Sequence, residues 1–266
     1  NGKDDIVIGT DDDHVYLIYD DGSTAPGFPF TATDKFQAAP SIADIDGEKI
    51  IFAGNNDNNL YAINSDGSLR FSVQTDYKVD TSPSFIDIDG SIYVTFGSQD
   101  NKMYAVDIDG NSLSGWPMIL DGNIEGGIVF SDLDVNGLPE IIAVTDAGTV
   151  SVFHLNDNPY HHFPISNNLP FTGPPIIVDL DGDSDLEIIT GSGSNLFVID
   201  IKESGSNSNY WNMFRGNKQR NGIYMPSDDD PECGADLGDV TGDGNINILD
   251  LVQIANYILN VGTPAY

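Results

Sequence analysis

The stretch Leu60-Tyr61-Ala62-Ile63 is a short apolar run of the kind that forms a β-strand, and four similar stretches recur along the chain. They are Val15-Tyr16-Leu17-Ile18, Met103-Tyr104-Ala105-Val106, Val150-Ser151-Val152-Phe153 and Leu196-Phe197-Val198-Ile199. Their starts lie 43 to 47 residues apart, so the chain repeats a unit of about 45 residues. We expect these five stretches to lie in the core.

Further landmarks recur at the same period. Four apolar runs end in Asp-x-Asp: Asp44-Ile45-Asp46, Asp87-Ile88-Asp89, Asp132-Leu133-Asp134 and Asp179-Leu180-Asp181. Hairpin turns are indicated by Asp21-Gly22, Asp66-Gly67 and Asp109-Gly110. Three units carry an aromatic residue before proline: Phe28-Pro29, Trp116-Pro117 and Phe163-Pro164. Proline cannot donate to a strand ladder, so these pairs should lie on a strand with an open edge.

Each unit therefore holds four short strands, which is the content of one β-propeller blade. The sequence predicts an all-β domain over residues 1–225, a β-propeller of about five four-stranded blades. The first blade is predicted to be incomplete, because residues 1–6 align with residues 136–141, in the middle of a loop. We expect its missing strand to come from a precursor, from residues 211–224, or from another chain.

The charge of the chain points to cations as ligands. Its 42 acidic residues against 10 basic ones give a formal charge of −32. Such a chain repels phosphate, which argues against nucleic acid or an anionic membrane as partner. No apolar stretch approaches the roughly 18 residues of a membrane span, so no membrane insertion is expected.

Two loops place carboxylates at alternate positions, as a Ca²⁺ ion requires. Loop 179–187 offers Asp179, Asp181, Asp183 and Glu187 at positions 1, 3, 5 and 9, with the carbonyl of Asp185 at position 7. Loop 132–140 offers Asp132, Asp134, Asn136 and Glu140, with Leu138 at position 7. The shorter Asp46-Gly47 and Asp89-Gly90 loops are predicted to be plain hairpin turns.

A different module follows the polar linker at residues 226–236. Residues 239–250 form a 12-residue loop with Gly244 at position 6 and oxygen ligands at the calcium positions of an EF-hand. These ligands are Asp239, Thr241, Asp243, Asn245, Asn247 and Asp250. A helix should follow, because Leu251, Ile254 and Ile258 share one helical face. Residues 237–266 are therefore predicted to be a small EF-hand-like loop-helix module that binds Ca²⁺.

The chain resembles two known families. Residues 1–225 are similar to the FG-GAP/VCBS and PQQ-like extracellular β-propellers, through their Asp-x-Asp loops, their Gly-Phe-Pro and Gly-Trp-Pro strands, and the segment Trp211–Gly222. Residues 237–259 resemble one repeat of a type I dockerin. Both resemblances imply a secreted, calcium-binding protein at the cell surface or outside the cell. Ile248 and Leu249 stand where dockerins often carry Ser-Thr-like residues, which indicates an apolar docking surface.

The leading hypothesis is a non-enzymatic protein of adhesion or extracellular self-assembly, possessing no catalytic residues. It would bind copies of itself or another extracellular protein through its propeller edge and its dockerin-like tail. The alternative is a polysaccharide-degrading enzyme, a glycosidase or a lyase, or a carbohydrate-binding component. A quinoprotein dehydrogenase is disfavoured, because such propellers usually have more blades. The basic cluster Arg215, Lys218 and Arg220 is interpreted either as an ion-paired blade closure or as a docking spot for an anion.

Overall fold

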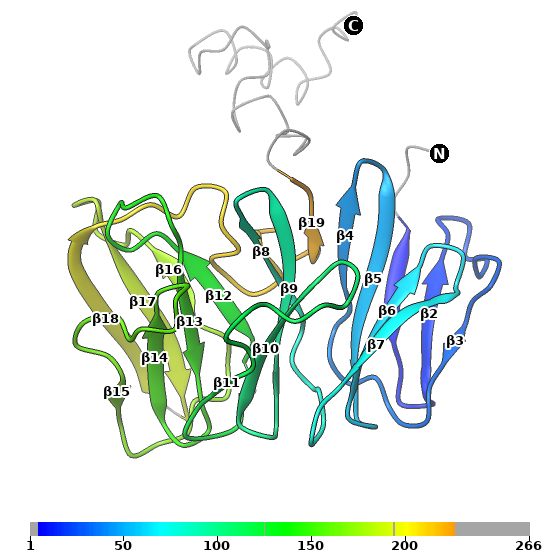
Figure 1. Ribbon diagram of the computed structural model, residues 1–266, viewed down its shortest axis with the longest axis horizontal. Coiled ribbons are helices and arrows are strands. Elements are labelled where there is room, and N and C mark those ends of the chain that lie inside the picture. The colour runs from blue at the N-terminus through cyan, green and yellow to red at the C-terminus, as the bar shows by residue number, and fades with distance from the viewer. Residues whose placement is uncertain (1–4, 125, 194, 227–266) are drawn as a thin grey trace, which may run out of the picture. The chain divides into compact units, whose positions relative to one another are not determined.

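The computed structural model describes residues 5–124, 126–193 and 195–226, and its strands build five small sheets (Figure 1). The chain divides into two units, Asn1–Met225 and Pro226–Tyr266, and every described strand belongs to the first unit. The described residues contain no helix, so the prediction of an all-β domain is confirmed for them. The linker from residue 227 and the loop-helix module at 237–266 lie outside the described residues.

The sheets follow one another in chain order. The first contains β1 (Ile6–Gly9), β2 (His14–Ile18) and β3 (Phe30–Thr31). The second contains β4 (Ser41–Ile45), β5 (Glu48–Asn55), β6 (Asn59–Asn64), β7 (Leu69–Gln74) and the distant β19 (Ile223–Tyr224). The third contains β8 (Ser84–Ile88), β9 (Ser91–Ser98), β10 (Lys102–Asp107) and β11 (Met118–Ile119). The fourth contains β12 (Ile128–Ser131), β13 (Glu140–Val144), β14 (Thr149–Phe153) and β15 (Ile165–Ser166), and the fifth contains β16 (Ile176–Val178), β17 (Asp185–Ser192) and β18 (Asn195–Ser204).

The prediction of four-stranded units is correct for the third and fourth sheets, and the described part of the first sheet lacks one strand, as predicted for an incomplete first unit. The first and fifth sheets have three strands and the second has five, and the described sheets do not close into a ring. The fifth sheet has no fourth strand because the chain leaves β18 for the interior of the unit. The second sheet gains a strand because β19 adds to β4 in parallel, with Ile223 opposite Ile42.

Successive sheets pack face to face through three apolar clusters. One cluster, which includes Val15 and Ile63, joins the first and second sheets. The largest, which includes Phe52, Phe85 and Phe130, joins the second, third and fourth. A third, which includes Ile142 and Ile188, joins the fourth and fifth. The recurring strands β2, β6, β10 and β14 contribute buried residues, as predicted. Two residues of the last recurring strand depart from this prediction, because Leu196 and Val198 are 70% and 48% exposed.

The short acidic loops are hairpin turns, as the sequence predicts. Asp46 and Gly47 have φ angles of 53° and 84°, and Asp89 and Gly90 have 53° and 79°. Two consecutive positive φ values are typical of the type I′ turn that joins adjacent strands. The three aromatic-proline pairs directly precede β3, β11 and β15, which are edge strands of their sheets. The prediction that the aromatic-proline pairs mark strands with an open edge is therefore confirmed.

One turn type recurs in four sheets, after β2, β6, β10 and β14. It spans residues 19–23, 64–68, 107–111 and 154–158. In each turn the first residue's N–H donates to the fifth residue's carbonyl, and the fourth residue's N–H donates to the first residue's carbonyl. The fourth residue has a positive φ angle and is Gly22, Gly67, Gly110 or Asp157.

Residues 205–224, which we name the crossing segment, run from the fifth sheet across the strands β12, β16 and β4. The N–H groups of Phe130 and Ile177 donate to the carbonyls of Trp211 and Asn212, and the N–H of Ile42 donates to the carbonyl of Gly222. The crossing segment thus pairs with three sheets and ends in β19. The hypothesis that residues 211–224 complete the first sheet is wrong, because their strand adds to the second.

Arg215 holds the crossing segment through backbone carbonyls. Its guanidinium donates to the carbonyls of Pro40 (2.9 Å), Arg220 (2.7 Å) and Asn221 (2.7 Å). None of the ion pairs found among the described residues involves Arg215, Lys218 or Arg220. The interpretation of this cluster as ion-paired is therefore wrong for the described residues, because the guanidinium of Arg215 binds carbonyl oxygens instead.

Candidate metal centres

The first candidate centre is loop 179–187, which joins β16 to β17. Four carboxylates lie together there, and each offers one oxygen so that all four oxygens are within 4.8 Å of one another. They belong to Asp181, Asp183, Asp185 and Glu187. Asp181 and Asp183 are exposed, whereas Glu187 is 4% exposed. An all-oxygen group that mixes exposed and buried carboxylates fits Ca²⁺, which takes six to eight oxygen ligands.

Carboxylates that lie this close repel one another when they are ionised. The side-chain hydrogen bond with Asp183, followed by burial, raises the pKa of Asp185 to about 6. The buried Oδ1 atom of Asp185 has no hydrogen-bond partner. Lys202 offers only partial compensation, since its ammonium contacts Asp200 and lies 3.9 Å from Asp185. A divalent cation would satisfy the oxygen without a partner and would relieve the repulsion.

Asp179, at position 1 of the loop, accepts hydrogen bonds from the loop backbone. Its carboxylate accepts the N–H groups of Gly182 (2.7 Å) and Ser184 (3.2 Å), and it lies outside the group of four. The side chain of Asp185 takes part instead, although the sequence assigned only its carbonyl. Position 1 therefore shapes the loop, while positions 3, 5, 7 and 9 gather the carboxylates.

The second candidate centre is loop 132–140, which joins β12 to β13 and has the same framework. The N–H of Leu133 donates to Glu140 (2.7 Å), as the N–H of Leu180 donates to Glu187 (2.6 Å). Asp132 is 4% exposed and accepts the N–H groups of Asn136 (3.1 Å) and Gly137 (2.9 Å). Asn136 and Leu138 are exposed, and the side chain of Asn136 accepts the N–H of Leu138 (2.8 Å).

A histidine that the sequence reasoning missed adjoins this loop. Nδ1 of His154 lies 2.8 Å from the carboxylate of Glu140, which is 1% exposed. Asp134, Glu140 and His154 each offer one ligand atom, and these atoms lie within 4.8 Å of one another, whereas Asp132 is not among these three residues. The missed signal was strand register: Ile141 pairs with Phe153, so the preceding Glu140 faces His154 across the ladder. Burial raises the pKa of Glu140, so a cation or a protonated imidazole stabilises its anion.

The predicted calcium ligands of the third loop lie outside the described residues. They are Asp239, Thr241, Asp243, Asn245, Asn247 and Asp250, all beyond residue 226. Among the residues that the structure describes, no helix is long and apolar enough to cross a membrane.

Comparisons with known proteins find one family and a set of similar folds. Residues 237–265 match the family model of the dockerin type I domain. No curated protein matches the chain in sequence.

Two crystal structures of BBS1N in complex with ARL6DN resemble the chain. The one soaked with mercury has a TM-score of 0.51 at 10% identity, covering 75% of this chain and 64% of that one. The one soaked with lead has a TM-score of 0.53 at 10% identity, covering 77% and 64%. The chain thus spans less than two thirds of those chains, and the likeness is one of fold.

Dockerin domains bind calcium and cohesin partners, and they occur in extracellular proteins. The match supports Ca²⁺ as a ligand of this chain and an extracellular setting for it. The similarity of this chain to the type I dockerin domain is confined to residues 237–265.

Proposed function

We propose that the chain is a secreted, non-enzymatic building block of adhesion or extracellular assembly, with a calcium-binding β-propeller of the FG-GAP/VCBS type followed by the dockerin domain. The observation that carries this proposal is the pair of apolar faces on the first and fifth sheets. The filled centre of the unit and the two carboxylate loops support it.

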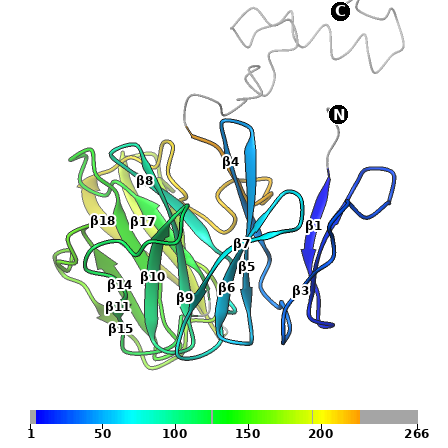
Figure 2. The same ribbon diagram turned by 45° about the vertical axis from the view of Figure 1, so that its right-hand side comes forward.

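The first and fifth sheets lie at opposite ends of the series of sheets (Figure 2). On β1, Ile6 and Ile8 are 59% and 46% exposed, while Val7 between them packs on the second sheet. On β18, Leu196 and Val198 are exposed in the same alternating way, while Phe197 packs on the fourth sheet. Each end sheet therefore buries one face and leaves the other open. In a series of stacked sheets, such open faces would be covered by the next sheet.

A second copy of the chain would supply that cover. The open face of the fifth sheet in one copy would pack on the open face of the first sheet in the next. The two faces differ, so the contact is head-to-tail and generates rings or filaments. Burying four aliphatic side chains, already partly covered, contributes about 4 kcal/mol or more before the costs of association.

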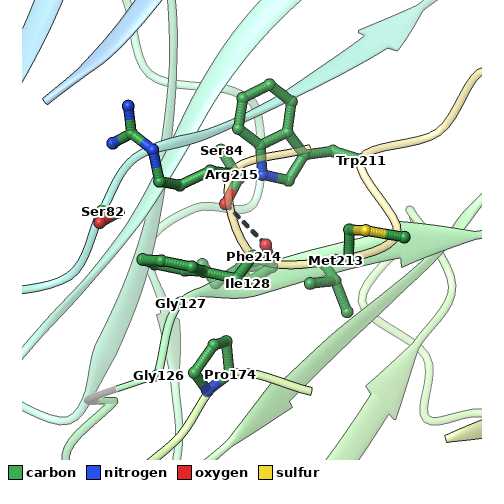
Figure 3. Close-up of a pocket in the computed structure, with 11 residues that line it drawn as sticks. Ser82, Ser84, Gly126, Gly127, Ile128, Pro174, Trp211, Met213, Phe214 and Arg215 are labelled. Carbon is green, nitrogen blue, oxygen red and sulfur yellow. Dashed lines mark hydrogen bonds between the residues drawn. The ribbon is translucent and has the colours of Figure 1, made fainter. Parts of the chain in front are cut away.

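The crossing segment packs aromatic side chains between the sheets. Trp211 of the crossing segment is 6% exposed, and its ring meets Phe85 edge to face at 5.2 Å. Tyr224 stacks on the same Phe85 at 5.3 Å. A cavity bounded by Trp211, Phe214 and Arg215 among others measures about 10 Å³ (Figure 3). This volume holds about one water molecule.

The lining of this cavity also argues against catalysis. None of its described lining residues is acidic. A glycosidase needs two carboxyl groups flanking the bond that it cleaves, roughly 5 to 9.5 Å apart. These features favour a binding protein over the polysaccharide-degrading enzyme.

The dockerin domain gives the second contact. We propose that it attaches the chain to an extracellular protein partner, through the apolar positions Ile248 and Leu249 of its calcium loop. Calcium bound by loops 132–140 and 179–187 would neutralise their carboxylates and would make the fourth and fifth sheets more rigid.

Light scattering in calcium tests the head-to-tail contact. We expect the mass of the full chain to rise with concentration. Ile8→Glu on β1 and Val198→Glu on β18 should each give monomers, because each leaves one face charged. An equimolar mixture of the two variants should give dimers only, since one intact face of each kind remains.

The matched control is Ile119→Glu on the edge strand β11. Ile119 is 76% exposed but belongs to neither end face, so this variant should assemble like the wild type. A strictly monomeric wild type, or a mixture that stays monomeric, would refute the assembly. Release of reducing ends or unsaturated products from a polysaccharide panel would refute the absence of catalysis.

A further inference from the structure

A cleft lies where the third sheet meets the fourth, and its lining includes none of the residues of loops 132–140 and 179–187. It measures about 240 Å³. One wall is the segment before β11, and the other is the recurring turn after β14. The lining residues are Ser114, Gly115, Trp116, Leu155, Asn156 and Asp157.

The same junction is closed between the first and second sheets. Gly27 precedes Phe28-Pro29 as Gly115 precedes Trp116-Pro117, and the two glycines have nearly equal φ angles of 85° and 88°. A Cβ atom placed on Gly27 would lie 1.8 Å from the carbonyl oxygen of Asp66, in the next sheet's turn. A Cβ atom on Gly115 would meet nothing within 4 Å. The cleft is therefore a local departure from a junction that elsewhere is tightly packed.

The next junction, between the second and third sheets, is also packed. A Cβ atom on Gly110 would lie 2.9 Å from the ring of Phe71. The side chain of Arg70 donates to the carbonyl of Ile108 (2.9 Å). At the junctions between the first and second sheets and between the second and third, the preceding sheet thus packs on the recurring turn. The cleft lies beside the recurring turn after β14.

Asp157 occupies the turn position that is glycine in the other three sheets. Its φ angle is 65°, which a residue with a side chain adopts at a cost. At the equivalent Gly67, a Cβ atom would lie 2.3 Å from the carbonyl oxygen of Gly27, so that junction admits only glycine. The open junction admits Asp157, whose exposed side chain lines the cleft.

The lining combines an indole with hydrogen-bonding groups. Trp116 is partly buried, since it packs on the main apolar cluster, and it also lines the cleft. Ser114, Asn156 and Asp157 are exposed and supply a hydroxyl, an amide and a carboxylate. The negative face of an aromatic ring attracts weakly positive C–H groups. The polar side chains can donate to and accept from several hydroxyl groups at once.

We propose that this cleft binds carbohydrate, as one or two pyranose units of a neutral sugar. A pyranose has a C–H face that packs on an indole, and a rim of hydroxyl groups that suits Asn156 and Asp157. The volume lies below the roughly 300–1,000 Å³ of pockets for drug-sized ligands, which favours a small ring. Asp157 and the charge of −32 repel acidic sugars. This site is independent of the head-to-tail contact, because it lies on neither end sheet.

Saturation-transfer NMR on the full chain tests the site. The probes are methyl glycosides of glucose, galactose, mannose and xylose, with galacturonic acid as the anionic probe. We expect transfer to at least one neutral glycoside and none to galacturonic acid. Weak, millimolar dissociation constants are expected for single rings, because few atoms make contact.

Two variants locate the binding. Trp116→Ala should weaken the affinity for the bound glycoside by about tenfold or more. Asp157→Gly restores the residue of the other turns, so it should fold at least as well as the wild type, and it should weaken binding similarly. Ser65→Ala, in the equivalent turn of the second sheet, is the control and should bind like the wild type.

The proposal fails if no neutral glycoside receives transfer, or if Asp157→Gly and Trp116→Ala bind as tightly as Ser65→Ala. It also fails if sugars do not bind but the cleft variants lower the mass measured by light scattering, because the cleft would then be a protein contact. Failure of the head-to-tail assembly leaves the expected sugar binding unchanged.

Discussion

Arg215 should be the residue whose loss most weakens the closure of the unit by the crossing segment. It makes three hydrogen bonds to carbonyls, two within the crossing segment and one to Pro40, just before β4. Burial lowers the pKa of Arg215, which reflects the cost of desolvating its charge. Hydrogen bonds to charged groups contribute roughly 1.5–3 kcal/mol each, and the desolvation cost offsets part of this. We expect Arg215→Ala to lower the free energy of unfolding by about 2–4 kcal/mol.

The assay is unfolding in urea, followed by the fluorescence of the two tryptophans, with a thermal melt beside it. A loss of this size should lower the melting temperature by roughly 5–15 °C, at about 2–4 °C per kcal/mol for a unit of this length. Arg215→Lys should lower the free energy of unfolding by nearly as much, because one ammonium group cannot reach three separated carbonyl oxygens. Lys218→Ala, an exposed change in the same segment, should be neutral. An Arg215→Ala variant within about 0.5 kcal/mol of the wild type would contradict this account of the closure.

Calcium should raise the melting temperature of the full chain, because a cation relieves the repulsion among Asp181, Asp183, Asp185 and Glu187; coincident melts in calcium and in chelator would show that no loop binds it. Asp239→Ala together with Asp243→Ala should remove the calcium bound by loop 239–250 and leave that of loop 179–187, as equilibrium dialysis would show. Gly67→Ala should lower the free energy of unfolding far more than Gly22→Ala. Both glycines have φ near 82°, but only at Gly67 would the added Cβ atom lie 2.3 Å from a carbonyl oxygen, that of Gly27. Equal losses in the free energy of unfolding, each of about 1–2 kcal/mol, would mean that backbone strain alone decides the effect. Burial raises the pKa of Asp80, so the Asp80 carboxyl group holds its proton more tightly in the folded state than in the unfolded chain. The ionised carboxylate therefore destabilises the folded state, and this effect develops as pH rises through the raised pKa. Asp80→Asn should therefore be more stable than the wild type at about pH 8 and converge with it at about pH 4, and parallel urea curves with a constant offset would disprove this.

The repeating part of the fold could be predicted from the sequence because its signals are local and recur. The strand containing Leu60–Ile63 has four counterparts, and each lies in the strand predicted for it. The hairpins at Asp46-Gly47 and Asp89-Gly90 follow from residues that tolerate positive φ angles. Local patterns of this kind depend on neighbours a few residues apart, which a single sequence displays.

The remaining features depend on residues that are distant in sequence. The strand β19 is two residues long, and nothing in Ile223-Tyr224 identifies β4 as its partner. His154 reaches Glu140 through strand register, which spacing in the loop does not reveal. The side chain of Asp185 lies beside those of Asp181, Asp183 and Glu187, and the carboxylate of Asp179 accepts backbone N–H groups; loop spacing reveals neither contact. The spacing of residues in loop 179–187 therefore identified the acidic residues, but it did not show which of their carboxylate oxygens lie close together.

The parallel pairing of β19 with β4 has a consequence for folding during synthesis on the ribosome. Arg215 reaches Pro40 across 175 residues of chain. At roughly 5–20 residues per second, a ribosome needs roughly 10–35 s to make that stretch. Throughout that interval β4 to β7 can already pair with one another, yet the outer edge of β4 has no neighbour. A message that stopped just before Ile223 would yield a product whose second sheet keeps four of its strands and presents β4 as a bare edge to other nascent chains.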